Sequence, residues 1–164
     1  MLPDPLHPAV VHLPMALAIL IPGFAILGLF LIYTEFLPAR SWVLIVLLQA
    51  LLVGSGWLAL ETGEDQEERV ERVVAERLIE DHEEAAERFL VIAGIALLAS
   101  AAGLLPRRIG AVGRATGTLA ALGVLAAGGY TGHLGGELVY KHGAASAYAE
   151  NPGETRTPRH VEDD

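Results

Sequence analysis

Cysteine is absent from the 164 residues of this chain. Its absence excludes disulfides, cysteine zinc sites, iron–sulfur clusters and thiol nucleophiles, so the chemistry must rest on histidines, carboxylates and the backbone. Basic residues are scarce: the chain has 11 lysines and arginines but 20 aspartates and glutamates. Its formal net charge is −9 at pH 7. No nucleic-acid partner is expected, since neutralising phosphates requires a basic surface.

Several catalytic motifs are also missing from the sequence. It contains no Gly-x-Ser-x-Gly, no phosphate-binding glycine loop with lysine and no His-Glu-x-x-His, and His82-Glu83 lacks a second histidine four residues later. These motifs place nucleophiles, phosphate ligands and zinc ligands in hydrolases and nucleotide-binding proteins. Neither class of chemistry is supported, and whether the protein is an enzyme stays open.

Apolar residues, in contrast, are abundant. They make up 52% of the chain, only 19% is charged, and the mean hydropathy is +0.44. Crossing a bilayer takes roughly 20 apolar residues in a helix, and uncharged runs near that length cover residues 13–33, 42–60, 89–105 and 115–136. With their flanking turns they predict membrane helices over about 9–33, 42–60, 75–105 and 110–142. The sequence therefore predicts an all-α fold, an integral membrane four-helix bundle in contact with lipid.

The segment between the second and third spans carries twelve acidic residues. Charged residues fill one face of this segment, and the apolar residues that recur at about three- and four-residue spacing up to the start of the third run are Val70, Val73, Val74, Leu78, Ala85 and Phe89. This period is typical of an amphipathic helix. The third helix is therefore predicted to extend outside the membrane. We interpret residues 1–150 as one transmembrane domain and residues 151–164, which are polar and contain two prolines, as a flexible tail.

Basic residues near the spans predict the orientation of the bundle. Arg40 follows the first span, and Arg107, Arg108 and Arg114 precede the fourth. Because loops with lysine and arginine stay in the cytoplasm, both termini are predicted outside. The first span lacks a basic leader and a small-residue cleavage site, so we expect it to stay in the mature protein. The expected location is the bacterial inner membrane, crossed several times.

Most of the histidines are predicted at the outer, periplasmic face, and none at the cytoplasmic ends of the spans. These candidate ligands are His7, His12, His82, His133 and His142. Imidazole is the commonest metal ligand and a frequent axial ligand of haem. His82 lies on the apolar stripe of its helix. His133 and His142 would face opposite sides of one continuous helix, so they cannot share a metal unless the chain breaks at a glycine.

Three functions fit this pattern. The first is a b-type haem protein for electron transfer, a carrier rather than a catalyst, with paired ligands from His12, His82, His133 and His142 and with His7 as a weaker candidate. The second is a zinc or copper site in which Glu61 or Glu137 joins the histidines. The third is a structural or accessory subunit, in which the histidines only form hydrogen bonds and a protein partner or a second copy covers the glycine-rich segment 128–136.

One polar residue lies in the middle of a span. Gln49 belongs to the second predicted span and has apolar neighbours along the chain. Polar side chains inside a bilayer usually bond to an adjacent helix. We therefore predict a hydrogen bond from the Gln49 amide to a neighbouring helix rather than a catalytic role.

Two motifs resemble those of a bacterial family of small membrane proteins known as domain of unknown function 2231. They are Leu-His-Pro-Ala-Val-Val-His-Leu-Pro at residues 6–14 and Gly-Gly-Glu-Leu-Val-Tyr-Lys-His-Gly at residues 135–143. His82 matches the histidine that opens the third helix of that family, and the resemblance covers residues 6–143. It implies four helices and a respiratory or cytochrome-like setting with haem and redox partner proteins. The long charged segment 64–87 departs from the family pattern.

Overall fold

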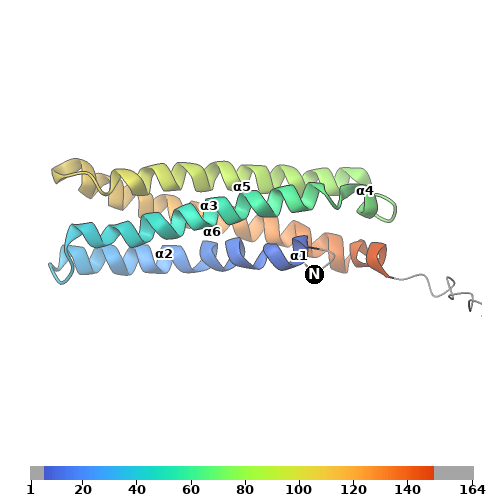
Figure 1. Cartoon of the computed structure of the whole chain (residues 1–164), viewed down its shortest axis with the longest axis horizontal. Coiled ribbons are helices and arrows are strands. Elements are labelled where there is room, and N and C mark those ends of the chain that lie inside the picture. Colours follow the sequence, from blue (N-terminus) through green and yellow to red (C-terminus); the bar gives the residue numbers. More distant parts are fainter. Residues whose placement is uncertain (1–5, 150–164) are drawn as a thin grey trace, which may run out of the picture.

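The protein is built from helices joined by short turns. The computed structural model describes residues 6–149, and no strand occurs in that range. The helical elements are α1 (His7–Val10), α2 (His12–Tyr33), η1 (Ala39–Trp42), α3 (Val43–Glu64), α4 (Glu67–Val70), α5 (Glu76–Ala102), α6 (Arg107–Tyr140) and η2 (Ala144–Tyr148). Figure 1 shows the long helices α2, α3, α5 and α6 side by side along one axis. The predicted all-α four-helix bundle is confirmed.

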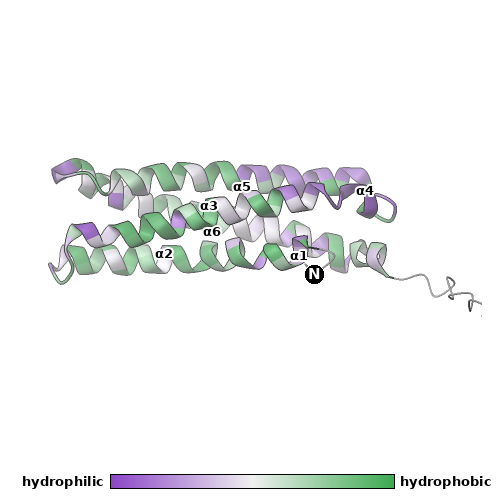
Figure 2. Ribbon diagram, in the orientation of Figure 1, coloured by the Kyte–Doolittle hydropathy of each residue, from purple (hydrophilic) through white to green (hydrophobic). Residues whose placement is uncertain are grey.

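Four helical stretches are long and apolar enough to cross a membrane. They are His7–Tyr33, Ala39–Glu64, Glu76–Ala102 and Arg107–Tyr140. The third begins within one residue of its predicted start, and its first half is hydrophilic, as Figure 2 shows. The predicted extension of this helix beyond the apolar region is therefore confirmed. The second helix runs to Glu64, four residues beyond the predicted end at residue 60.

The two ends of the bundle differ in their residues. One end carries α1, α4 and η2, and both ends of the described chain lie there (Figure 1). We call it the histidine end, because the five histidines of the described range lie on the elements nearest to it. The other end holds the two turns that join α2 to α3 and α5 to α6, and we call it the arginine end after Arg40, Arg107, Arg108 and Arg114. The first and last described residues thus lie at the same end of the bundle.

The core of the bundle consists of small and medium apolar side chains. Ala25, Leu52, Ala93 and Ala96 are fully buried. Helices gain little from apolar burial within lipid, so their association depends on close van der Waals contact and on hydrogen bonds between them. One such bond is donated by the indole Nε1 of the buried Trp42 to the carbonyl oxygen of Ser100, 3.0 Å away. It joins η1, directly before α3, to α5 near the arginine end.

Helices α5 and α6 approach each other through glycines. A Cβ added to Gly113 would lie 2.4 Å from the backbone nitrogen of Gly103 and 2.5 Å from the carbonyl carbon of Ala102. A Cβ on Gly117 would lie 2.6 Å from the Ser100 hydroxyl oxygen. Because no side chain fits in these gaps, the two backbones are in direct contact, as small residues permit in membrane bundles.

The prediction for Gln49 was wrong. Its side chain is fully buried on α3, but neither its amide nitrogen nor its amide oxygen has a hydrogen-bond partner within the described range. The neighbouring helices present mainly apolar and small side chains at this depth, so no acceptor or donor comes within reach. A buried amide without partners is costly, and the position therefore needs a separate explanation.

A small apolar cluster caps the histidine end. It contains Val74, between α4 and α5, Leu138 on α6 and Ala144 on η2. The chain turns from α6 into η2 at Gly143, whose φ of 74° lies in the left-handed region that glycine adopts without strain. On the same cap, the Tyr148 hydroxyl donates to Gln66 Oε1 at 2.9 Å. The segment after α6 is therefore fastened to the turn region after α3.

The glycine contact between α5 and α6 gives the first prediction. Gly113→Ala should lower the free energy of unfolding by about 1–3 kcal/mol, because the new methyl group overlaps backbone atoms that cannot rotate away. Thermal unfolding in detergent measures the change. The matched control is Gly129→Ala on the same helix, where an added Cβ meets nothing within 4 Å. This variant should raise the free energy of unfolding by roughly 0.5–1 kcal/mol, because alanine favours the helix over glycine. Equal unfolding temperatures for the two variants would contradict the direct contact of the helices.

Candidate functional site

His7 lies at the first turn of α1, packed against α3. Pro8 occupies the start of this helix, where its missing N–H is tolerated, and His7 is half-buried. Its ring rests on the backbone of α3 because residue 63 is glycine: a Cβ there would lie 3.2 Å from His7 Cε1. The short helix α1 thus places an imidazole on the inside of the histidine end.

A hydrogen bond determines which nitrogen of His7 is available. His7 Nδ1 lies 2.8 Å from the carbonyl oxygen of Ala59 on α3. A carbonyl oxygen only accepts, so Nδ1 must carry the proton and donate it. In the neutral ring, Nε2 then holds the lone pair, and it has no partner within the described part of the chain. Metal-binding histidines commonly have this arrangement, in which a second hydrogen bond fixes the tautomer.

His82 enters the same end of the bundle from α5. It is half-buried on the apolar face of the helix, as its stripe in the sequence predicts. Its ring faces Gly135 on α6, where a Cβ would lie 3.0 Å from His82 Cε1, and the backbone carbonyl of Thr131 is nearby. The Nδ1 atom of His82 is buried and has no hydrogen-bond partner among residues 6–149. A buried ring nitrogen without a hydrogen bond is an exception among the polar atoms of proteins.

The two rings come together although the residues are far apart in sequence. His7 is close enough to His82 that positive charges on both rings would repel each other. Four helices contribute to the site: the rings come from α1 and α5, and the glycines that make room for them, Gly63 and Gly135, come from α3 and α6. We call these four residues the imidazole site. Each ring has a nitrogen without a partner in the described structure.

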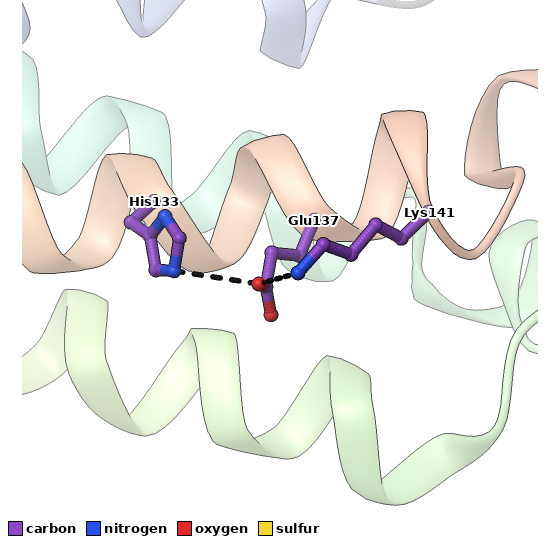
Figure 3. Close-up of polar contacts among 3 residues, drawn as sticks. All are labelled: His133, Glu137 and Lys141. Atoms are coloured by element: carbon purple, nitrogen blue, oxygen red, sulfur yellow. Dashed lines mark hydrogen bonds and ion pairs between the residues drawn. The ribbon is translucent and has the colours of Figure 1, made fainter.

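His133 forms a different, exposed group. Its Nε2 lies 3.3 Å from Glu137 Oε1, and Lys141 binds the same oxygen one turn further along α6 (Figure 3). The His133 side chain is 66% exposed. Glu137 thus approaches a histidine, but this histidine is exposed on the surface of α6. The lysine already neutralises the carboxylate, so the group resembles an ordinary surface ion pair.

The remaining predicted site residues are also at the surface. His12 on α2, His142 beyond the end of α6 and Glu61 on α3 are exposed. Helix α6 is continuous to Tyr140, so His133 and His142 are not brought together by a break at Gly135 or Gly136. The structure therefore unites His82 with His7, which the sequence ranks lowest, and leaves the other candidates apart. The predicted tail, with His160, lies outside the described residues.

The structure also limits the kind of metal site. No three histidines, aspartates or glutamates of residues 6–149 are grouped so that they could hold one ion. Two grooves of about 370 and 490 Å³ are present, the first between the end of α5 and the start of α6 and the second between α2 and α3. Both have mainly apolar linings, and neither includes a histidine. The imidazole site is thus a separate place, where two imidazoles rather than three potential ligands lie at one end of the bundle.

Sequence reasoning did not identify three partners of the two rings. They are the Ala59 carbonyl, Gly63 and Gly135, all of which act through the backbone. Gly63 lies three residues beyond the predicted end of the second helix, among acidic residues, where a glycine usually indicates the end of a helix. Only Gly135 lay in a segment that the sequence singled out, and there it was one glycine among five. No pattern in a single sequence shows which glycine faces a ring.

The fold and its apolar helices define the protein as a multi-pass integral membrane protein of the four-helix type. The family described as predicted membrane protein (DUF2231) matches residues 3–147, and the chain belongs to this family. The resemblance seen in the sequence is thereby confirmed. Comparison with curated proteins and with solved structures gives no match. The family description states a membrane location and no activity.

Crosslinking tests the proximity of His7 and His82. Because the chain has no cysteine, His7→Cys combined with His82→Cys introduces the only thiols. A short bismaleimide added to membranes should join them within one chain, detected by protease digestion and mass spectrometry. His7→Cys with Glu84→Cys is the control, because Glu84 is exposed on α5 and pairs with Arg88. Equal crosslinking of both pairs would show that α1 does not hold His7 against the inside of the bundle.

Proposed function

We propose that this protein is an integral membrane b-type haem protein for electron transfer, and that His7 and His82 are its axial ligands. A single observation carries the proposal: two half-buried imidazoles from different helices lie within range of each other's charge at one end of the bundle, and each has a ring nitrogen without a partner in the described chain. A buried polar atom without a partner is unfavourable, and a bound ligand supplies the missing interaction.

The number of donors supports haem over a tetrahedral metal. Structural zinc takes four protein ligands and catalytic zinc three, whereas a haem iron needs only one or two side chains because the macrocycle supplies the rest. The imidazole site offers two histidines, and no group of three potential ligands occurs in residues 6–149. Cysteine and methionine are not needed, and neutral imidazole is the form that binds.

The residues around the rings would prepare them for this role. The Ala59 carbonyl holds the His7 proton on Nδ1, which keeps the lone pair of Nε2 free and orients the ring. Gly63 and Gly135 keep side chains away from the two rings. A haem held by His7 and His82 would supply one-electron chemistry. Because both histidines would be its protein ligands, the site would leave no position for a substrate, and the protein would serve as a carrier rather than an enzyme.

The site's position also suits electron transfer. It lies at the histidine end, among the last turns of the helices, so a redox partner approaching that end comes near it. We place this end at the outer face of the bacterial inner membrane, because the arginines gather at the opposite end. Respiratory or cytochrome proteins are the expected partners. A second copy of the chain is a further possible partner.

A structural role is the second candidate, and the bond from His7 to Ala59 favours it. This bond fastens α1 to α3 at 2.8 Å and would stabilise the fold by about 1 kcal/mol without any cofactor. In that case the protein acts as an accessory subunit. The His82 nitrogen would then stay unpartnered, which this role does not explain.

Visible spectra of the purified protein test the haem proposal. Protein from cells supplied with iron and a haem precursor should show a Soret band and, after reduction, a sharp α-band of low-spin haem. His7→Asn and His82→Ala should each abolish the low-spin α-band, whereas His12→Ala and His133→Ala should retain it, because the latter two side chains are exposed.

His7→Asn separates the two candidate functions. An asparagine amide keeps an N–H donor for the Ala59 carbonyl but has no counterpart of Nε2. Haem ligation predicts a folded variant that has lost the low-spin α-band, and a structural role predicts no spectral change and unaltered thermal unfolding. A colourless wild-type protein would contradict the haem proposal, and elemental analysis would then show whether copper or zinc takes its place.

A further inference from the structure

Two fully buried polar side chains in the membrane-spanning core have no hydrogen-bond partner. Gln49 on α3 and Ser100 on α5 are both 0% exposed. The amide nitrogen and oxygen of Gln49 and the hydroxyl oxygen of Ser100 are unpartnered within the described residues. Most buried polar atoms in proteins are bonded to protein or to an ordered water. Two such exceptions in the same core call for a common explanation.

The register of α3 and α5 brings these side chains into one layer. Gly56 on α3 faces Phe89 on α5, since a Cβ on Gly56 would lie 3.5 Å from that ring. The two helices are antiparallel, so moving seven residues back along α3 from Gly56 matches moving seven residues forward along α5 from Phe89. Gln49 therefore lies at the same depth as Ala96. Gln49 is therefore about one turn, or roughly 5 Å along the axis, from Ser100.

The tilt of the side chains reduces this separation. The Cα–Cβ bonds of an α-helix tilt toward its N-terminus. Helix α3 begins at the arginine end, so Gln49 tilts toward the layer of Ser100. Helix α5 begins at the histidine end, so Ser100 tilts back toward the layer of Gln49. The two side chains thus lean toward a common layer, where the Ser100 hydroxyl lies beside Gly117 of α6, and neither group is hydrogen-bonded to the other.

The residues around Gln49 and Ser100 are mostly small and are buried. Ala96 and Ala121 are fully buried at this depth, and Gly117 faces Ser100 without a side chain. On the arginine side, Trp42 is 1% exposed and its indole is bonded to the Ser100 carbonyl. On the histidine side, Leu52 is fully buried. Larger buried side chains thus lie on both sides of this layer along the bundle axis, and small residues lie within it.

We propose that a water molecule is bound between Gln49 and Ser100 and bridges α3 and α5 inside the membrane. Its partners are the Gln49 amide and the Ser100 hydroxyl, which both donate and accept. Together they offer three polar atoms, within the two to four that buried waters use. An ion is excluded as the ligand, because the buried polar residues of the described chain are uncharged and a lone charge in such a core is very costly.

Nuclear magnetic resonance on the full-length protein in lipid nanodiscs tests this proposal. The chain has only two glutamines, Gln49 and Gln66, so the side-chain amide signals of Gln49 are identified by their loss in Gln49→Leu. The expected result is a nuclear Overhauser cross-peak between the Gln49 side-chain amide protons and water, with amide protons that persist in D₂O. No cross-peak to water, or a cross-peak only to the Ser100 hydroxyl proton, would overturn the proposal.

Two serine variants link the water to Ser100. Ser100→Ala should remove the cross-peak to water, because the site loses one of its two bridging partners. Ser55→Ala is the matched control: Ser55 is also buried on α3, but its hydroxyl already donates to the Leu52 carbonyl at 3.1 Å. If Ser100→Ala does not fold, Ser100→Cys preserves the volume with a much weaker donor and should weaken the cross-peak. Loss of the cross-peak in Ser55→Ala instead would assign the water elsewhere.

Discussion

Direct backbone contact between α5 and α6 is the constraint on which the rest of the structure depends. Lipid offers helices no hydrophobic reason to associate, so the bundle relies on close packing along a face of small residues. On α6 this face includes Gly113 and Gly117 near the arginine end, Gly128 against Phe89, and Gly135 against His82. The small residues that hold the two helices together thus also make room for the ring of His82 at the histidine end. One face of α6 therefore serves both the packing of the helices and the proposed haem site.

Polar groups in the core are arranged by that packing. Where helices touch, side chains are too small to satisfy a polar neighbour, so Gln49 and Ser100 stay without protein partners and His82 keeps an unpartnered nitrogen. The bundle has two such places, one in the middle and one at the histidine end. They suit different ligands: the central one is closed and uncharged, whereas the terminal one offers two imidazoles. The water and haem proposals rest on separate residues and stand independently.

Much of the fold was predictable because hydropathy and helical period are local properties. The four spans, the extension of α5 to Glu76 and the apolar orientation of His82 follow from runs and stripes in the sequence. The partner of His82 was not predictable. His7 seemed the weakest candidate beside Pro8, and it becomes an inner residue only because α1 folds onto α3 at Gly63. Likewise, the partner expected for Gln49 is missing because tertiary packing, not sequence distance, decides what lies opposite an amide.

The central claim is that His7 and His82 hold one iron between them. The most direct test is anomalous X-ray scattering at the iron absorption edge, on crystals of protein purified from cells supplied with iron and a haem precursor. The account predicts one iron peak per chain, located between the rings of His7 and His82. An iron peak at His12, His133 or His142, or well-ordered crystals without iron, would contradict it.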